Sequence, residues 1–393
     1  MITVRVATVG GDLDLEARLA SAIAKRRDAE LLLRCVDRIE LLAAIRGAGL
    51  DALVVAGQPS WLDHQSVSEA ATRGVRIVGV SDGEAPLGAS AVLGSDASVD
   101  EILEACRNAS PANPSLPQVG GKGRLTTVWG PKGAPGRTRV AIELAFEIQS
   151  TQATCALIDA DPYGGDVLQS LGIVEEMPTV VWAARAAGRG ELSDAQIEQY
   201  LRRVEDGPII IPGIPRSELW ADVSLFGFKA LLDSFRGLVD HTVIDVGFSL
   251  DTDIPTLDTT DGRNRMTIAA IRESDRVVAV LRADPLGLKN FLWGFEGLAA
   301  LVDDDRIVIV ANRVRDGQER QIAEIVRKHT GRRPAAYLPD VPSLAESAIE
   351  LGGRIAADKG AAGYSAAIQS LAISTGARLQ PKGVLIKLGG RKR

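Results

Sequence analysis

The stretch LTTVWGPKGAPGRTRVAIELAFEIQS, residues 125–150, contains a short apolar run, a turn rich in glycine and proline, and a helical pattern in succession. The apolar run predicts a strand, and Val140, Leu144 and Ile148 recur at every fourth position, which places them on one face of a helix. A strand, a glycine-bearing loop and a helix in this order form the structural context of a phosphate-binding loop. This order is the feature that distinguishes a phosphate loop from a chance cluster of glycines.

This turn, GPKGAPGRT, departs from the usual pattern G-x-x-x-x-G-K-[ST]. In that pattern, backbone N–H groups cradle the phosphates, the lysine reaches the outer phosphates and the hydroxyl ligates magnesium. Here Arg137 stands at the lysine position, and Thr138 keeps the hydroxyl. Pro131 and Pro135 have no amide hydrogen to donate. The residues alone leave three interpretations open: a nucleotide site, a decayed site, or a coincidental cluster of glycines.

The composition limits the classes of function. A chain of 393 residues, 46% hydrophobic and with few aromatics, predicts two or three domains with cores of Val, Leu, Ile and Ala. A net charge of -6 disfavours sequence-independent nucleic-acid binding. The three cysteines lie far apart without C-x-x-C spacing, which indicates neither a disulfide framework nor a zinc site and is typical of the cytoplasm. We expect no signal peptide and no membrane span, so that any membrane contact would be peripheral.

Residues 108–124 combine Pro, Gly, Ser and Asn without apolar periodicity, which predicts a linker. On both sides of it, in 1–107 and 125–375, short apolar runs alternate with helical patterns, which predicts two α/β domains with parallel sheets. The remaining segment, 376–393, is a basic tail with a brief apolar patch, which leaves peripheral membrane contact open.

The order of elements in 1–107 resembles a response-regulator receiver domain, which has a flavodoxin-like fold. A receiver needs an aspartate at the end of its third strand, acidic residues after the first strand and a lysine after the fifth. Here Ala56 and Gly57 stand near the phosphoacceptor position, no lysine follows the fifth strand, and only Asp12 lies near the first. We therefore expect an interaction domain that does not accept phosphate.

Polar residues end several predicted strands downstream of the linker. The segment LIDADPYGGDV places Asp159 and Asp161 at a strand end before a glycine turn, HTVIDVG ends in Asp245 like a Walker B strand, and VIVANRV ends with Asn312. Each residue has a simpler alternative as a helix cap, a solvent-exposed carboxylate or a turn residue, and Lys132 as an ordinary loop lysine. Their order favours a nucleotide site with magnesium, because such a site needs all of these groups.

Over residues 125–375 these motifs resemble those of the MinD/ParA group of P-loop ATPases. The group's deviant loop, K-G-G-x-G-K-T, corresponds to KGAPGRT, and its D-x-D-P-x-G-G motif is met by DADPYGG. A receiver-like domain ahead of such an ATPase is similar to the CpaE/TadZ-like proteins of Tad pilus assembly. The resemblance implies a cytoplasmic protein that binds ATP and Mg²⁺, forms an ATP-dependent homodimer and positions pilus or secretion machinery.

The resemblance also implies a role for each matching residue. The lysine of the deviant loop would reach across a dimer to the partner's phosphates, a carboxylate would position the attacking water, and an amide would read adenine. The implied catalytic groups are Lys132 and Asp161, the magnesium ligands, direct or through water, are Thr138, Asp159 and Asp245, and the cofactor-binding groups are Gly130, Lys132, Gly133, Ala134, Pro135, Gly136, Arg137, Thr138, Arg139 and Asn312.

Departures from the family pattern predict slow or impaired hydrolysis. Arg137 replaces a compact ammonium with a planar fork, and Ala134 adds a methyl group where the family has glycine. Phosphoryl transfer depends mainly on positioning, so these changes affect it most. Two alternatives stay open: a pseudo-ATPase scaffold, and a septum-site or chromosome-partitioning ATPase. The retained carboxylates and hydroxyl favour a nucleotide-linked role over the scaffold, and the net acidity weakly disfavours DNA binding.

Overall fold

The computed structural model describes residues 3–10, 13–47, 49–57, 59, 61–62, 64–83, 85–111, 123–133, 135–151, 153–174, 179–192, 197–251 and 262–377. The chain divides into two compact units, Met1–Gln118 with Gly188–Glu191, and Val119–Ala187 with Leu192–Arg393. The main division falls inside the predicted linker, of which residues 112–122 lie outside the described residues. Residues 378–393 of the predicted basic tail also lie outside them.

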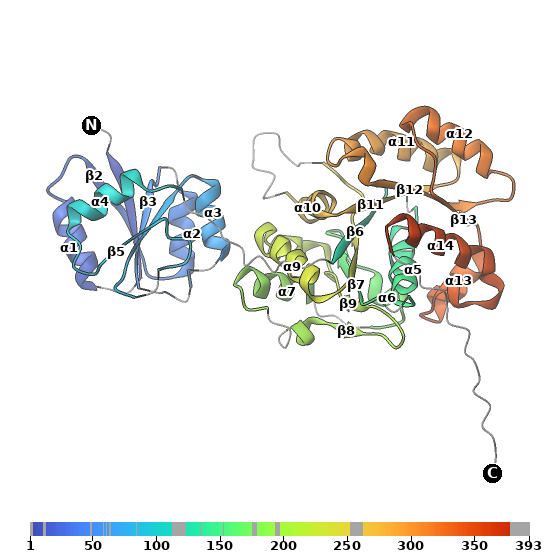
Figure 1. Ribbon diagram of the computed structural model, residues 1–393, viewed down its shortest axis with the longest axis horizontal. Coiled ribbons are helices and arrows are strands. Elements are labelled where there is room, and N and C mark those ends of the chain that lie inside the picture. Colours follow the sequence, from blue (N-terminus) through green and yellow to red (C-terminus); the bar gives the residue numbers. More distant parts are fainter. Residues whose placement is uncertain are drawn as a thin grey trace, which may run out of the picture. The chain divides into compact units, whose positions relative to one another are not determined.

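The first unit is built on a five-stranded parallel sheet with the order β2-β1-β3-β4-β5 (Figure 1). This order is that of flavodoxin-like doubly wound sheets. One buried cluster packs α1 and α4 on one face, and a second packs α2 and α3 on the other. The elements are β1 Val4–Val9, α1 Leu13–Ile23, β2 Ala29–Cys35, α2 Arg38–Arg46, β3 Ala52–Ala56, α3 His64–Thr72, β4 Arg76–Val80, β5 Ala91–Leu93 and α4 Val99–Asn108.

The third strand of this unit ends without a carboxylate. β3 stops at Ala56, and Gly57 turns the chain with φ 69°, in the left-handed region that favours glycine. Asp12 lies outside the described residues. The parallel α/β architecture predicted for this unit is thus confirmed, and its kinship with receiver domains stays a prediction.

The second unit is built on an eight-stranded sheet with the order β13-β12-β11-β6-β10-β7-β9-β8 (Figure 1). The ladders are parallel except for β8, which pairs antiparallel with β9. The strands are β6 Arg124–Trp129, β7 Cys155–Ala160, β8 Arg202–Arg203, β9 Ile209–Ile211, β10 His241–Val246, β11 Arg276–Arg282, β12 Ile307–Val314 and β13 Ala336–Pro339. Continuous Val- and Ile-rich runs predict β6, β7 and β9 to β12, because strands covered on both faces are apolar throughout. The structure confirms these six strands and adds β8 and β13.

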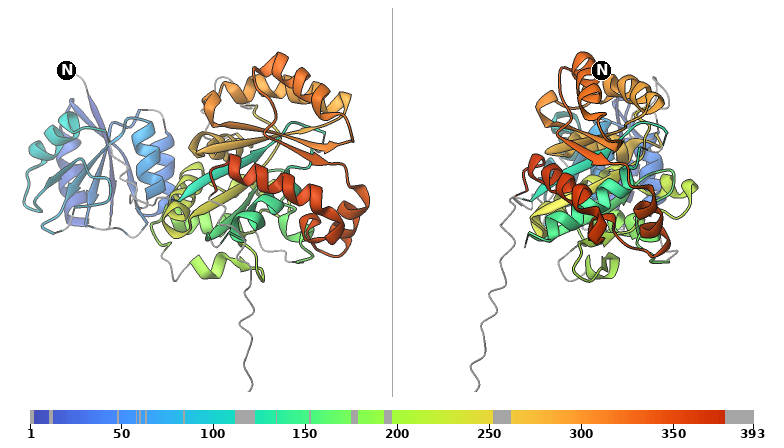
Figure 2. Two further views of the ribbon diagram at one scale, coloured as in Figure 1. Left: turned by 45° about the vertical axis from the view of Figure 1, so that its right-hand side comes forward. Right: turned by 90° about the vertical axis from the view of Figure 1, so that its right-hand side faces the viewer.

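Helices cover both faces of this sheet. Helix α5 packs against β10, β7 and α14 on one face, and α9 and α10 contact each other and β10 on the other (Figures 1 and 2). The helices are α5 Arg137–Gln149, α6 Val167–Ser170, α7 Thr179–Gly188, α9 Leu225–Leu238, α10 Arg265–Glu273, α11 Pro285–Ala299, α12 Glu319–Thr330, α13 Pro342–Glu350 and α14 Ala362–Ser374. None of the helices that the described residues form has the length and apolar character needed to cross a bilayer.

Helix α5 is more deeply buried than its periodicity predicts. The pattern at Val140, Leu144 and Ile148 predicts one apolar face, but every residue from 140 to 148 is buried. The residues between these positions, including Glu143, are enclosed because α14 and the segment at 355–356 pack against α5. The predicted helix is therefore confirmed, and its burial extends beyond the face that carries Val140, Leu144 and Ile148.

Candidate functional site

The predicted phosphate loop lies at the carboxyl end of β6, where ligands bind in open parallel sheets. Strand β6 ends at Trp129 and α5 begins at Arg137, so the loop directly precedes a helix N-terminus. Gly133 and Gly136 have φ of 102° and 93°, a backbone conformation that L side chains rarely adopt. A Cβ on Gly136 would also lie 2.5 Å from Nδ2 of Asn312. Ala134 lies outside the described residues.

Side chains from four parts of the unit bind the carbonyl oxygens of this loop. The hydrogen bonds run from Arg137 Nη1 to Gly130 O (3.3 Å), Asn290 Nδ2 to Lys132 O (3.2 Å), Arg282 Nη1 to Gly133 O (3.0 Å) and Asn312 Nδ2 to Pro135 O (2.8 Å). At the first turn of α5, the N–H groups of residues 137–139 have no acceptor among the described residues. Free N–H groups at a helix N-terminus attract anions. The loop therefore offers donors while its carbonyls are satisfied elsewhere.

Arg137 folds back onto the loop and the neighbouring strand. Its Nε donates to the carbonyl oxygen of Val246 at 3.1 Å, and its Nη2 lies 3.4 Å from Oδ2 of Asp161. Only 14% of the side chain is exposed. The positive charge expected at the lysine position is present, but its donors are engaged with the protein. A phosphate on the loop would have to share this guanidinium with Asp161 or displace it.

Asp245 is a buried carboxylate near the start of α5. Burial raises the pKa of Asp245 to about 7. The positive charge of Arg137 and a hydrogen bond from the Thr138 side chain act in the opposite direction and lower the pKa by less. Its Oδ1 is buried and has no hydrogen-bond partner among the described residues. A buried carboxylate oxygen without a partner costs folding free energy, and a bound ligand would remove that cost.

Asp159 lies beside Asp245 on the adjacent strand, since the two residues are partners in the β7–β10 ladder. Its Oδ1 accepts from the N–H of Asp161 at 3.3 Å, and its Oδ2 accepts from the N–H of Val167, the first residue of α6, at 3.1 Å. Burial raises the pKa of Asp159 well above its usual value, and the charge of Asp245 adds to this effect. Both oxygens are thus committed to the backbone, and a role for Asp159 in binding magnesium stays a prediction.

Asp161 follows β7 and faces the loop through Arg137. Its Oδ1 accepts from the N–H of Tyr163 at 2.9 Å, and 13% of its side chain is exposed. Burial raises the pKa of Asp161. The hydrogen bond from the Tyr163 N–H and the charge of Arg137 lower it, but by less. The structure therefore places the predicted catalytic carboxylate next to the loop, paired with the arginine of the lysine position.

The remaining predicted residues have different surroundings. Asn312 is buried, and both ends of its amide are engaged. Its Nδ2 donates to the carbonyl oxygen of Pro135, and its Oδ1 accepts from the N–H of Arg313 at 2.9 Å, so that the amide anchors the loop to β12. Lys132 is exposed. The Arg139 guanidinium turns to the carbonyl oxygen of Gly353, at 2.8 Å. The adenine-reading role of Asn312 stays a prediction, because the structure shows the amide in a structural role.

Sequence reasoning missed two of the anchors of the loop. Asn290 lies in α11 and Arg282 ends β11, 158 and 149 residues from the carbonyls that they bind. A single asparagine inside the apolar helical run of α11 was the available signal for Asn290, because a buried amide needs a partner. Arg282 carried no signal, since basic residues commonly end strands.

Two polar residues next to the site, Asn264 and Arg265, are buried at the start of α10. Asn264 is 2% exposed, and its Nδ2 donates to the carbonyl oxygen of Asp251 at 2.8 Å. Arg265 is 8% exposed, and its Nε donates to the carbonyl oxygen of Val223 at 2.9 Å. These hydrogen bonds offset the cost of burying the two polar side chains. Residues 252–261 lie outside the described residues.

The donor set fits magnesium only together with a phosphate ligand. Among the described residues, no cluster of three or more His, Cys, Asp and Glu side chains forms a metal site. Magnesium in nucleotide sites is usually held by one or two protein oxygens, phosphates and water. The hydroxyl of Thr138 and the unpaired oxygen of Asp245 meet that requirement.

Comparison with known proteins identifies the fold of the second unit. No family model and no curated protein matches the sequence. The solved structure of a ParA family ATPase from Chlorobium tepidum matches with a TM-score of 0.54 and 16% identity, covering 64% of this chain and 98% of that one. The cell-division ATPase MinD from Pyrococcus furiosus matches with a TM-score of 0.49 and 17% identity, covering 64% of this chain and 98% of that one.

A septum site-determining protein MinD from Pyrococcus horikoshii, solved with Mg-ADP, matches with a TM-score of 0.48 and 17% identity, covering 63% of this chain and 94% of that one. The structural neighbours are thus ATPases of the MinD and ParA families. At these identities the likeness is one of fold, and it rests on the ParA family match, whose TM-score is the highest of the three.

Proposed function

We propose that the second unit binds Mg-ATP at the loop 130–138 and acts as a nucleotide-dependent, dimerising positioning factor with slow hydrolysis. One observation carries the binding proposal: side chains satisfy the loop carbonyls, while the first N–H groups of α5 are open near Asp245. The ParA-type fold of the unit supports the same assignment.

Each group in the site has a defined part in this proposal. The N–H groups of the first turn of α5 would bind phosphate oxygens, as helix N-termini do. Thr138 and Asp245 would hold magnesium, which when bound supplies positive charge that offsets the charge of the phosphates. Asp161 would orient the attacking water once Arg137 no longer holds its Oδ2.

The ion pair between Arg137 and Asp161 supports slow turnover. The guanidinium occupies Oδ2 of Asp161, so it competes with the attacking water for the carboxylate that would orient that water. The same arginine holds the carbonyl oxygens of Gly130 and Val246, which restrains it from following a transferring phosphoryl group. A protein that binds ATP and hydrolyses it slowly stays in its ATP-bound state for longer, as a nucleotide-dependent switch requires.

The finer assignment is a CpaE/TadZ-like role, in which the protein marks a cytoplasmic position, such as a pole at the inner face of the membrane, for pilus or secretion machinery. Two features of the first unit support it: the 2-1-3-4-5 strand order and the absence of a carboxylate at Ala56 and Gly57. A septum-site or chromosome-partitioning role is compatible with the same ATPase fold. Affinity purification that recovers pilus motor proteins would support the pilus role, whereas recovery of division or partition proteins would favour the other.

A second candidate function is a pseudo-ATPase scaffold. It is favoured by the donors of Arg137, which the protein itself satisfies.

Calorimetric titration of the full chain with Mg-ATP separates the two candidates. We expect binding by the parent and at least about tenfold weaker binding by Thr138→Ala, which equals about 1.4 kcal/mol. Thr72→Ala, on α3 of the first unit, is the matched control and should bind like the parent. A flat titration at millimolar ATP with folded parent protein would establish the scaffold.

A further inference from the structure

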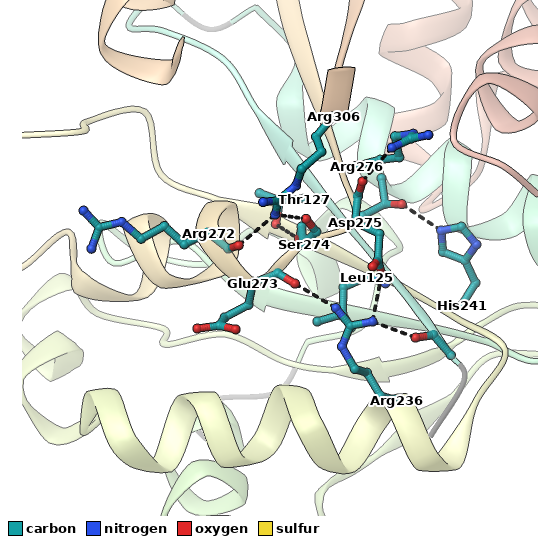
Figure 3. Close-up of polar contacts among 12 residues, drawn as sticks. Leu125, Thr127, Arg236, His241, Arg272, Glu273, Ser274, Asp275, Arg276 and Arg306 are labelled. Atoms are coloured by element: carbon teal, nitrogen blue, oxygen red, sulfur yellow. Dashed lines mark hydrogen bonds and ion pairs between the residues drawn. The ribbon is translucent and has the colours of Figure 1, made fainter. Parts of the chain in front are cut away.

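A pocket of about 630 Å³ lies at the amino ends of β6 and β11, away from the phosphate loop at the carboxyl end of β6. It is formed where the last turns of α9 and α10 meet the starts of these strands, and Figure 3 shows four of its arginines, Arg236, Arg272, Arg276 and Arg306. None of the residues that line it belongs to the candidate ATP site.

The pocket is lined by five arginines and two acidic residues. Both carboxylates already have cationic partners. Glu273 Oε1 lies 2.9 Å from Nζ of Lys229, and Asp275 Oδ2 accepts from Nη1 of Arg236 at 2.8 Å. The lining therefore keeps an excess of positive charge. The five arginines are Arg124, Arg236, Arg272, Arg276 and Arg306.

Two of these arginines have a structural explanation. Arg236 Nη2 donates to the carbonyl oxygen of Glu273 at 2.7 Å, and Arg306 Nη2 donates to the carbonyl oxygen of Arg272 at 2.7 Å, as the dashed lines in Figure 3 show. They cap the last carbonyls of α10, where cations are favoured. This capping also fixes both guanidinium groups at the pocket.

The other three arginines have no such explanation. With the described residues, the Arg276 guanidinium makes one hydrogen bond, from Nη1 to the carbonyl oxygen of Asp275 at 3.0 Å. The guanidinium groups of Arg124 and Arg272 make no hydrogen bond or ion pair with the described residues. In addition, Nε of Arg306 is buried without an acceptor in the described part of the chain. A buried unpaired donor is costly, and a ligand oxygen would satisfy it.

From this charge, this volume and these free donors we propose that the pocket binds a small polyphosphate anion of the pyrophosphate and tripolyphosphate class. Guanidinium groups bind phosphate through paired N–H donors and are the preferred residues for that purpose. The volume is within the range of small-ligand sites. The lining contains glycine, serine, arginine and acidic residues but no apolar or aromatic side chain, so it offers no surface for a nucleotide base.

The proposal is independent of ATP binding, because the two sites are at opposite ends of β6. It is tested by calorimetric titration of the full chain with tripolyphosphate, without magnesium and at fixed ionic strength. We expect the double variant Arg124→Gln/Arg276→Gln to bind at least about tenfold more weakly than the parent, because it removes two charged donors.

Two controls decide where the anion binds. Arg320→Gln/Arg327→Gln removes two charges from α12, outside the pocket, and should bind within about twofold of the parent. The loop variant Arg137→Ala/Thr138→Ala should also keep tripolyphosphate binding while losing ATP. If the α12 variant binds tripolyphosphate as weakly as the pocket variant, the effect is one of net charge. If the loop variant loses tripolyphosphate binding, the anion binds at the phosphate loop. Either result overturns the proposal.

Absence of binding by the parent also overturns it. Thermal unfolding shows whether each variant is folded. If the pocket double variant does not fold, Arg272→Gln replaces it, because the Arg272 guanidinium has no partner among the described residues. We expect about threefold or greater weakening from this single change, and affinity equal to that of the parent would refute the proposal. Weaker binding of orthophosphate than of tripolyphosphate is expected as well, and the reverse order would contradict a polyphosphate site.

Discussion

Arg137 engages several groups around the loop, among them the carbonyl oxygens of Gly130 and Val246 and the carboxylate of Asp161. A lysine at this position has one compact ammonium and cannot span all of them. Since the side chain is mostly buried, its contacts are little screened by water. The arginine thus stabilises the conformation of the loop and would compete with a nucleotide for it.

The first prediction follows from this competition. Arg137→Lys should raise ATP turnover about tenfold, which corresponds to an activation free energy about 1.4 kcal/mol lower, because Asp161 is then free to orient the attacking water. Steady-state phosphate release measures it. Arg327→Lys, on α12 and outside the loop, is the control. Unchanged or slower turnover in Arg137→Lys would show that the arginine does not limit hydrolysis.

Asp245 carries the second prediction. Its buried Oδ1 has no partner among the described residues, so Asp245→Asn should stabilise the nucleotide-free protein by roughly 1–3 kcal/mol. The same change should abolish the magnesium dependence of ATP binding. Urea unfolding at pH 8 measures the first effect and calorimetry the second. Asp251→Asn, after β10, is the control. A destabilised Asp245→Asn protein would mean that the carboxylate has a structural partner.

His241 begins β10, and the third prediction concerns its protonation. It is 3% exposed, and its Nε2 lies 2.8 Å from the hydroxyl of Thr126. Burial lowers the pKa of His241 to about 4, and the charge of Arg124 acts in the same direction. Because the unfolded chain takes up this proton near pH 6.5 and the folded chain near pH 4, stability falls as the pH drops through that interval.

The loss from this group is about 1.4 kcal/mol per pH unit. We expect His241→Gln to remove that component of the slope between pH 6.5 and pH 4, measured as the free energy of unfolding in urea. His329→Gln, an exposed site on α12, should leave the slope unchanged. If His241→Gln and the parent have the same slope, the imidazole accepts a proton in the folded state.

The fourth prediction concerns Glu143, a buried carboxylate of helix α5 that contacts the segment at 354–356. Glu143 Oε1 accepts from the N–H of Ile355 at 2.6 Å, and its Oε2 lies 3.4 Å from Nε of Arg354. Glu143→Ala should destabilise the unit by roughly 3–5 kcal/mol, because breaking a buried pair leaves the partner groups unpaired. Urea unfolding measures this loss, with Glu324→Ala on α12 as the exposed control. A loss below about 1 kcal/mol would assign the packing to the apolar contacts alone.

Much of this architecture could be predicted from local sequence. Val- and Ile-rich runs locate the central strands of the second unit, because strands covered on both faces need no polar alternation. The four-residue β13 and the two-residue β8 were missed, since such short strands have no clear periodicity. The complete burial of α5 was missed because α14, distant in sequence, supplies the second packing surface.

The residues of the candidate site could be predicted from the sequence, but the hydrogen bonds that hold them in place could not. Glycines, carboxylates and the Thr138 hydroxyl follow strand ends, and the structure brings Asp161 and Asp245 to the same edge of the sheet as the loop. The bonds that hold the loop carbonyls come from residues near 282 to 312, and no local pattern reveals such partners. The commitment of Asp159 to the start of α6 is equally a product of tertiary packing.

Strand β6 connects the two candidate sites of the second unit. It begins at Arg124 in the basic pocket and ends at Trp129 before the phosphate loop, a length of about 20 Å at 3.3 Å per residue. An anion at each end would therefore interact weakly through water at physiological salt, since the separation exceeds the Debye length of about 8 Å. Any coupling between the two ligands would have to pass through the strand and its neighbours.

Lys132 is the exposed cation of the loop, and the last prediction concerns the dimer. Its carbonyl oxygen is held by Asn290, while its ammonium makes no hydrogen bond or ion pair with the described residues. A flexible point charge of this kind can reach the phosphates of a second copy. We expect Lys132→Ala to lose ATP-induced dimerisation, measured by light scattering with and without ATP. Lys289→Ala is the matched control, because that ammonium lies 4.0 Å from the ring centre of Trp293 on α11. Equal ATP-induced dimerisation in Lys132→Ala and the parent would reduce Lys132 to an ordinary loop lysine, and an equal loss in Lys289→Ala would attribute the effect to surface charge.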